Sequence, residues 1–190
     1  MNCQSASVKR LSLERLISHQ RPDIVIGTES WLHAGIENQT IFPTDVYQVF
    51  RRDREKGNTM GGVFILDKKE LTITREEELE TDCELLWCRV EIQESKSLHI
   101  AAYYRPNEKD EHSLDELKKS LHRLGEHDDG VIIAGDFNLP GWDWKQHEMK
   151  SGCHYPLLHN RFIDILNDTG LTQLVEEPTR EKNTLGSNMH

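Results

Sequence analysis

The sequence comprises 190 residues, of which 36% are hydrophobic and 29% charged, and its 33 acidic and 23 basic residues give a formal net charge of −10. This length and composition predict a single globular domain over residues 1–190 and exclude a disordered chain. Because no apolar run approaches the roughly 20 residues of a spanning helix, we expect no membrane partner. The acidic balance argues against a module that holds nucleic acid by charge alone, but it is compatible with an enzyme that has local basic contacts.

The cysteines show no C-x-x-C pairing, so we expect free thiols in a reducing, intracellular compartment and no disulfide-linked partner. The first five residues contain no apolar signal region, and secretion is therefore not indicated. Four possible zinc ligands near the carboxyl end fit no standard zinc spacing: His147, Cys153, His154 and His159. We interpret the histidines among them as exposed loop residues.

The first expected element is a helix over residues 8–19. One face of this helix is expected to carry Leu13, Leu16, Ile17 and Gln20, and Ser5 or Ser7 could cap its start. Proline at position 22 then ends the helical pattern.

Strands dominate the middle of the chain. A short buried strand over residues 24–28 ends at Glu29, and further strands are expected where apolar residues alternate between turn-forming residues: 47–51, 63–66, 71–74, 86–92 and 98–104. The acidic run from Glu76 to Glu84 is interpreted as an exposed loop.

The last part of the chain alternates helices with strands. Leucines at helical spacing predict a helix over residues 113–124, with Ser113 and Glu116 as its capping box. Four apolar residues at 131–134 predict a strand buried on both faces. A helix over 159–168 and a last strand over 171–175 complete an α+β chain in which sheet packs on sheet.

Polar residues follow several strands at their carboxyl ends: Glu29, Tyr104 with Arg105, and Asp136 with Asn138. Residues two apart project to the same side of an extended chain, so we expect Asp136 and Asn138 to lie side by side. Carboxylates and amides suit a hard divalent cation or a phosphate oxygen held near one, which is the chemistry of phosphodiester hydrolysis.

These polar and basic segments also have other interpretations. A calcium loop starting at Asp136 is rejected, because its fifth and twelfth positions would be Pro140 and His147. The basic cluster Arg51, Arg52, Arg54 and Lys56 is typical of a solvated hairpin tip or of a phosphate contact.

Six short motifs occur in the order found in the endonuclease/exonuclease/phosphatase superfamily: Asn2–Ser5, Gly27–Leu32, Gly61–Val63, Tyr104–Asn107, Gly135–Asn138 and Asn183–Leu185. The chain resembles in particular the endonuclease domains of non-LTR (LINE-like) retrotransposons, themselves similar to apurinic/apyrimidinic endonucleases. The resemblance extends over nearly the whole chain. It implies a four-layer α/β sandwich, in which two packed mixed sheets are flanked by helices and the active site lies at one end of the sheets.

The resemblance also implies an activity, which is the nicking of DNA with Mg²⁺ or Mn²⁺, and makes the nucleus a plausible location. Asn2 would orient the phosphate or a metal-site carboxylate, and Glu29 would be the principal metal ligand.

The remaining roles implied by the resemblance concern the phosphate and the attacking water. Tyr104 would contact the scissile phosphate, and Asn138 would hold it in the transition state. Asp136 would align or deprotonate the water. Arg105 would contact the DNA backbone.

The sequence departs from the family pattern near its end. The family's Asn-Thr-Leu is normally followed by Asp, where this chain has Gly186, and the Ser-Asp-His motif expected farther on does not occur before His190. The missing Asp-His pair would supply acid–base help of about 10²–10⁴-fold. We therefore expect a fragment, truncated at its carboxyl-terminal catalytic strands, with weak or no activity.

Two alternatives stay open. A phosphatase of the same fold would act on inositol lipids or sphingomyelin. A non-catalytic binding remnant would keep the scaffold without its chemistry. The sequence itself predicts neither the oligomeric state nor a downstream reverse transcriptase.

Overall fold

The computed structural model describes residues 1–54, 60–125, 129–143 and 145–175. The chain divides into two compact units, Met1–Asn138 and Leu139–His190, each with its own secondary structure. A single domain over residues 1–190 stays a prediction. None of the described helices combines the length and apolar character needed to cross a bilayer.

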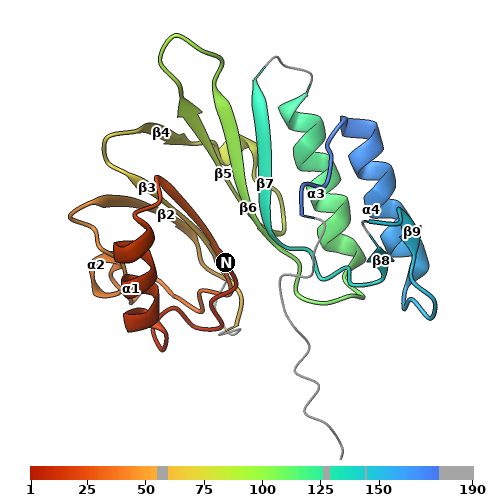
Figure 1. The fold of residues 1–190 in the computed structure, drawn as a ribbon, viewed down its shortest axis with the longest axis horizontal. Coiled ribbons are helices and arrows are strands. Elements are labelled where there is room, and N and C mark those ends of the chain that lie inside the picture. Colours follow the sequence, from red (N-terminus) through yellow and green to blue (C-terminus); the bar gives the residue numbers. More distant parts are fainter. Residues whose placement is uncertain (55–59, 126–128, 144, 176–190) are drawn as a thin grey trace, which may run out of the picture. The chain divides into compact units, whose positions relative to one another are not determined.

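Two β-sheets form the centre of the first unit (Figure 1). The first sheet has the antiparallel order β1 (Ile24–Thr28), β3 (Val63–Lys68), β2 (Tyr47–Arg52). The second sheet has the order β4 (Thr72–Arg75), β5 (Glu84–Glu91), β6 (Leu98–Tyr104), β7 (Gly130–Asp136). Its β6–β7 pairing is parallel and the others are antiparallel, so one sheet is antiparallel and the other is mixed.

The two sheets pack face to face through alternate residues of their strands. Val63 and Ile65 of β3 belong to one buried cluster with Leu86 of β5 and Ile100 of β6. Because successive residues of a strand point to opposite faces, the intervening Phe64 is left for the outer side of the first sheet. The core between the sheets therefore follows directly from the alternation in the sequence.

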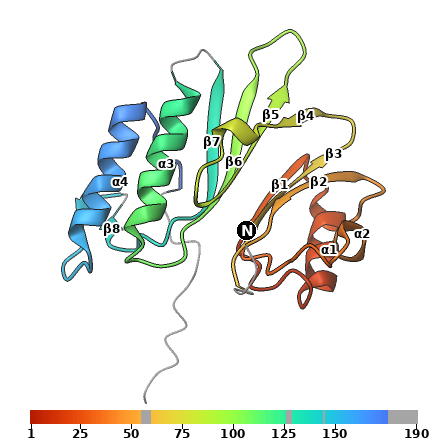
Figure 2. The same ribbon diagram turned by 180° about the vertical axis from the view of Figure 1, so that it is seen from behind.

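Helices cover both outer faces of this sandwich (Figures 1 and 2). α1 (Arg10–Gln20) packs Leu13 and Ile17 in one cluster with Phe64 on the first sheet, beside the short α2 (Asn38–Ile41). α3 (Glu111–Leu124) lies against the second sheet, where Trp87 Nε1 donates to Ser120 Oγ at 2.8 Å. The predicted four-layer α/β sandwich is confirmed within this unit, except that its first sheet is antiparallel and not mixed.

The second unit contains a two-stranded sheet and one helix. β8 (Trp142–Asp143) pairs antiparallel with β9 (Glu148–Met149). α4 (Pro156–Thr169) has proline in its first turn and ends at Gly170, whose φ of 67° suits a glycine cap.

The helix caps differ from the predictions. α1 begins at Arg10 without a side-chain cap, and Ser5 Oγ instead accepts from the Val8 N–H at 3.3 Å, before the helix. The capping box of α3 is wrong, because Asp110 is the N-cap and accepts from the Ser113 N–H at 2.9 Å. The Asp110 carboxylate accepts from the Ser113 N–H in place of Glu116, and the helix therefore starts at Glu111.

Three expectations about strands and loops also need correction. β7 lies at the edge of its sheet, and Ile132 is 42% exposed, so this strand is not buried on both faces. Residues 171–175 form no strand and pair with no described strand; Leu174 is 81% exposed. The acidic run is not simply a loop, since it contains the 3-10 helix η1 (Glu77–Leu79) and ends inside β5.

Replacing Ser120 by alanine is expected to lower the free energy of unfolding by about 1–2 kcal/mol, because the fully buried Trp87 N–H loses its acceptor. Urea denaturation measures the change. Ser12→Ala, at an exposed position of α1, serves as the control and should stay within about 0.5 kcal/mol of the parent. Equal stability of the two variants would contradict this role of Ser120.

Candidate functional site

A row of polar side chains crosses the end of the second sheet. Tyr104 of β6 is paired in register with Glu84 of β5 on one side and with Asp136 of β7 on the other. Paired residues on neighbouring strands project to the same face. Since Tyr104 belongs to the core between the sheets, this row faces the first sheet.

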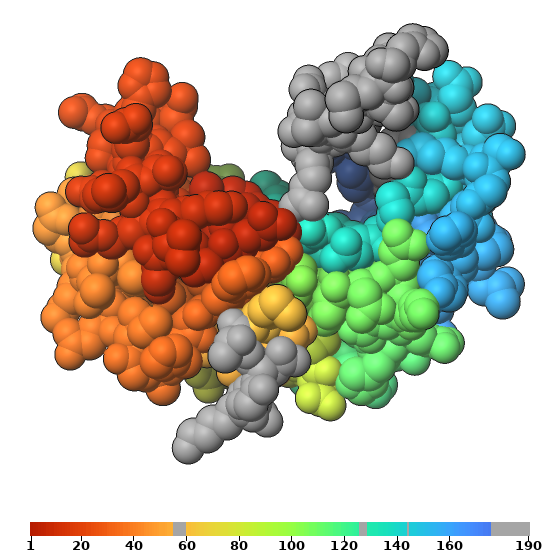
Figure 3. All heavy atoms as spheres, turned by 90° about the horizontal axis from the view of Figure 1, so that it is seen from below, coloured from red at the N-terminus to blue at the C-terminus, as the bar shows by residue number. Residues whose placement is uncertain are grey.

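The first sheet contributes Glu29 and the amino-terminal segment. Thr28 ends β1 and forms a parallel bridge with Asn2, which fixes the amino-terminal residues beside this strand. The space-filling view shows the red amino-terminal segment lying directly against the orange part of the same unit (Figure 3). Glu29 follows with φ 53°, a left-handed conformation that turns the chain at the strand end.

The side-chain amide of Asn2 joins the two acids. Its Nδ2 donates to Glu29 Oε1 at 2.5 Å and to Asp136 Oδ2 at 2.9 Å. Glu29 and Asp136, which lie 107 positions apart in the sequence, therefore meet at one amide group. The structure brings together Asn2, Glu29, Tyr104 and Asp136 of the predicted site.

Asn138 is placed differently from the prediction. It has φ 48°, so the chain is no longer extended after Asp136 and the two side chains do not project in parallel. The Asn138 N–H donates to Asp136 Oδ1 at 3.1 Å, and its side-chain Nδ2 donates to the Arg105 carbonyl at 2.5 Å. Asn138 thus closes a turn that orients Asp136.

Arg105 is buried, with no exposed surface. Its guanidinium donates to four backbone carbonyls at 2.7–3.2 Å: Glu108, Asp110, Phe137 and Asn138. Burial lowers the pKa of this guanidinium, which still stays protonated at neutral pH. The expected contact with the DNA backbone finds no support in this position; Arg105 instead holds the loop of Asp136 and Asn138.

Tyr104 is only 8% exposed. Burial raises the pKa of its phenol to about 12, and the three neighbouring carboxylates act in the same direction. The phenol is therefore protonated at neutral pH. It can donate a hydrogen bond to an anionic oxygen, as contact with a phosphate requires.

Glu84 is a part of the site that the sequence analysis missed. Its Oε2 accepts from the Gly62 N–H, and its Oε1 accepts from Arg54 Nε at 2.7 Å. Burial raises the pKa of the Glu84 carboxyl, against the opposing effects of Gly62 and Arg54. The register that places Glu84 beside Tyr104 is not visible in the sequence. The Gly61–Gly62 pair was the one available signal for this region.

The donor set suits a hard cation. Asn2 Oδ1 is buried and has no hydrogen-bond partner among the described residues, and it lies on the amide that joins both carboxylates. The atoms that could bind a metal here, the Asn2 amide oxygen and the carboxylate oxygens, are the ligands that Mg²⁺ and Mn²⁺ prefer. Across the described part of the chain, no three His, Cys, Asp or Glu side chains cluster as metal ligands. An ion at this site would therefore need water or phosphate to complete its shell.

The residues weighed as zinc ligands do not all lie in exposed loops. His159 belongs to α4, is 2% exposed, and accepts from the Gly141 N–H through Nε2 at 2.9 Å. Cys153 Sγ lies 3.6 Å from His159 Nδ1. The imidazole thus ties the start of the second unit to its helix, a structural role.

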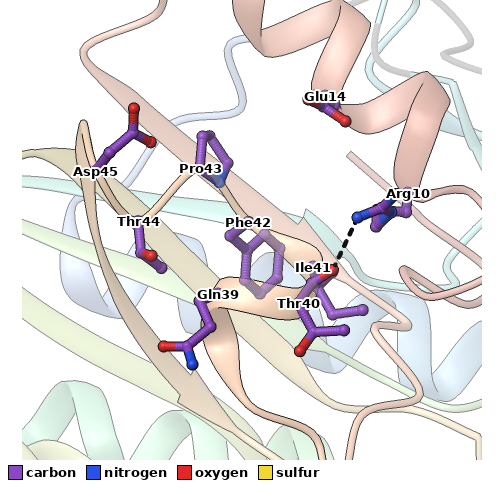
Figure 4. Close-up of a pocket in the computed structure, with 9 residues that line it drawn as sticks. All are labelled: Arg10, Glu14, Gln39, Thr40, Ile41, Phe42, Pro43, Thr44 and Asp45. Carbon is purple, nitrogen blue, oxygen red and sulfur yellow. Dashed lines mark hydrogen bonds between the residues drawn. The ribbon is translucent and has the colours of Figure 1, made fainter.

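A surface pocket of about 280 Å³ lies elsewhere in the first unit, lined by Arg10, Glu14, Gln39, Thr40, Ile41, Phe42, Pro43, Thr44 and Asp45 (Figure 4). Arg10 NH1 donates to the Thr40 carbonyl at 3.4 Å across it. Its lining includes none of the predicted site residues.

Comparison with known proteins gives one family and a set of similar structures. Residues 98–189 match a family model described as endonuclease-reverse transcriptase. The endonuclease domain of TRAS1, a telomere-specific non-LTR retrotransposon, is similar in structure with 16% identity, a TM-score of 0.67, and coverage of 93% of this chain and 72% of that one.

Two AP endonucleases are also similar in structure. The enzyme from Leishmania major has 15% identity, a TM-score of 0.65, and coverage of 88% of this chain and 65% of that one. The enzyme from Archaeoglobus fulgidus has 18% identity, a TM-score of 0.60, and coverage of 87% and 68%. No curated protein matches the sequence. At these identities the structural likeness establishes the fold.

Proposed function

We propose that the chain is a metal-dependent DNA-nicking domain of a retrotransposon-like protein, within the endonuclease/exonuclease/phosphatase superfamily. The match of residues 98–189 to an endonuclease-reverse transcriptase family and the similar folds support this proposal. The observation that carries this proposal is the Asn2 amide, which holds the Glu29 and Asp136 carboxylates together. Two acids joined by one amide, beside a protonated phenol, form the donor set that phosphodiester hydrolysis requires. A retrotransposon-like nuclease would meet its DNA in the nucleus, which is the compartment we propose.

The residues divide the chemistry as follows. Glu29 and Asn2 Oδ1 would hold Mg²⁺ or Mn²⁺, which when bound polarises the phosphoryl oxygen and stabilises the leaving alkoxide. Asp136 accepts a hydrogen bond from the attacking water and orients it. The Tyr104 hydroxyl donates to a non-bridging phosphate oxygen. Asn138 acts by fixing the turn after Asp136, with its backbone N–H on that carboxylate.

The rate of the isolated 190 residues is expected to be low. Gly186 stands where the family has Asp, and it lies outside the described residues together with the whole Asn183–Leu185 motif. Loss of general acid–base help would lower the rate by about 10²–10⁴-fold. Binding of the cation is therefore a more direct test than turnover.

Millimolar Mg²⁺ or Mn²⁺ is expected to raise the free energy of unfolding by about 1–3 kcal/mol, because an ion that binds only the folded state stabilises it by mass action. Glu29→Gln should abolish this increase. Glu14→Gln, an exposed carboxylate of α1, is the matched control and should leave it intact. Denaturant titration with and without the ion measures both.

Nicking of supercoiled plasmid then separates the outcomes. Weak Mg²⁺-dependent nicking that Glu29→Gln removes supports the nuclease. Hydrolysis of a soluble phosphomonoester, with no action on DNA, would instead favour a phosphatase of this fold. Stabilisation that is equal in the parent and in Glu29→Gln would overturn the proposed cation site.

A further inference from the structure

We propose that Glu84 is a positioning residue that holds the Glu29 turn in place from across the two sheets. Glu84 begins β5 in the second sheet, whereas Glu29 follows β1 in the first. The inference rests on the proposed function in that it gives the Glu29 turn a purpose, which is to direct the carboxylate toward a cation.

The connection begins at the Glu84 carboxylate, whose side chain is 13% exposed. One oxygen accepts from the Gly62 N–H and the other accepts from Arg54 Nε at 2.7 Å. Both oxygens are therefore engaged, and Glu84 itself is not available as a cation ligand. An ionised acceptor binds a backbone N–H about twice as strongly as a neutral one.

Gly61 and Gly62 carry the connection to the turn. The Gly62 carbonyl accepts from the Ser30 N–H at 3.2 Å, and the Gly61 carbonyl accepts from the Trp31 N–H at 2.9 Å. Both glycines have positive φ, 105° and 83°, a conformation that suits glycine.

The turn needs this support because it is strained. Glu29 and Trp31 have φ of 53° and 55°, a region in which residues other than glycine cost roughly 1–2 kcal/mol each. Such conformations persist only where the surrounding structure fixes them. The two hydrogen bonds from the Gly61–Gly62 segment contribute to that constraint on one side of the turn, while the Ser5 and Ala6 N–H groups donate to the Glu29 and Ser30 carbonyls at 3.0 and 2.8 Å on the other. Glu84 fixes the Gly61–Gly62 segment.

Arg54 supplies the countercharge that stabilises the buried Glu84 carboxylate. A largely buried carboxylate without a countercharge would be protonated or would draw in water. The Arg54 guanidinium pairs with Glu84, and its charge also acts on Tyr104. Three adjacent strands therefore carry three proposed roles in one row. Glu84 supports the turn, Tyr104 donates a hydrogen bond, and Asp136 is the reactive carboxylate.

Amide hydrogen exchange tests the connection without any ion or activity. In Glu84→Ala the Ser30 and Trp31 amides should exchange at least about tenfold faster relative to amides of the second sheet, since their acceptors lose their anchor. Glu84→Gln keeps an acceptor for the Gly62 N–H and should restore most of the protection. Unchanged exchange in Glu84→Ala would overturn the proposal.

Glu116→Ala is the matched control. Glu116 also accepts a backbone N–H, from Asp82 at 3.0 Å, and pairs with a cation, Lys119, but it lies on α3. This variant should be destabilised to a similar degree while the Ser30 and Trp31 amides stay protected. Equal deprotection in both variants would mean that Glu84 is merely structural, and would also overturn the proposal.

Calorimetric titration with Mn²⁺ gives the functional readout. Supports of metal ligands typically contribute 10–100-fold to affinity, so Glu84→Ala should bind Mn²⁺ about tenfold more weakly, and Glu84→Gln within about threefold of the parent. Equal affinity in Glu84→Ala and the parent would refute a positioning role. If the parent shows no Mn²⁺ binding, or shows binding that Glu29→Gln leaves unchanged, the proposed function fails. The hydrogen-exchange result still decides whether Glu84 anchors the turn.

Discussion

Arg105→Ala is expected to lower the free energy of unfolding by about 4 kcal/mol, among the largest effects of any single change in the first unit. The guanidinium has no exposed surface and donates to four backbone carbonyls. Truncation removes the shared donor of those carbonyls and leaves a space where a fully buried side chain had been. Two of them belong to Phe137 and Asn138, so the turn that orients Asp136 loses its anchor as well.

Guanidinium chloride denaturation measures the stability of this variant. Arg89→Ala, at an exposed position of β5, is the control and should change stability by less than about 1 kcal/mol. Arg105→Lys should fall between the two, because an ammonium has three donors and lacks the planar fork that reaches four carbonyls. A loss below about 1 kcal/mol in Arg105→Ala would show that the loop is held by other contacts.

Gly135→Ala is expected to cost about 3 kcal/mol and to abolish cation-dependent stabilisation. A Cβ at this position would lie 1.8 Å from the Tyr103 carbonyl oxygen, a backbone atom that cannot rotate away. Strands β6 and β7 would have to separate beside Asp136, which is the next residue. The carboxylate would then leave the reach of the Asn2 amide.

Gly130→Ala provides the control within the same strand. A Cβ there would meet only the flexible end of Leu98, at 3.0 Å, so a small loss of stability is expected, with cation-dependent stabilisation intact. Thermal unfolding with and without Mn²⁺ measures both quantities. Equal behaviour of the two alanine variants would contradict the close approach at Gly135.

The sequence predicted the elements better than their surroundings. Apolar alternation in β3 and β5 and leucine spacing in α3 report periodicity, which is local, and those elements were placed within a few residues. The strand at residues 171–175 failed because its apolar residues have no described partner strand. Pairing is a property of the whole sheet, and local pattern does not contain it.

The candidate site shows the same division. The family resemblance assigned Glu29 and Asp136 to one site, and in the structure both carboxylates accept hydrogen bonds from the Asn2 amide; their catalytic roles stay predictions. The family resemblance suggested that Arg105 contacts DNA, whereas its guanidinium donates to carbonyls of its own loop. Glu84 was assigned to a loop, because the register that aligns it with Tyr104 arises only when β5 and β6 pair.

The amide of Asn2 has a mechanical consequence. Its two hydrogen bonds end on carboxylates that follow or end strands of different sheets, so a small displacement of one sheet over the other is expected to separate the acids before the core between the sheets is lost. Mild denaturant should therefore weaken cation binding at the proposed site while the spectroscopic signature of the fold is still native. Cation binding would then report how well the two sheets are aligned.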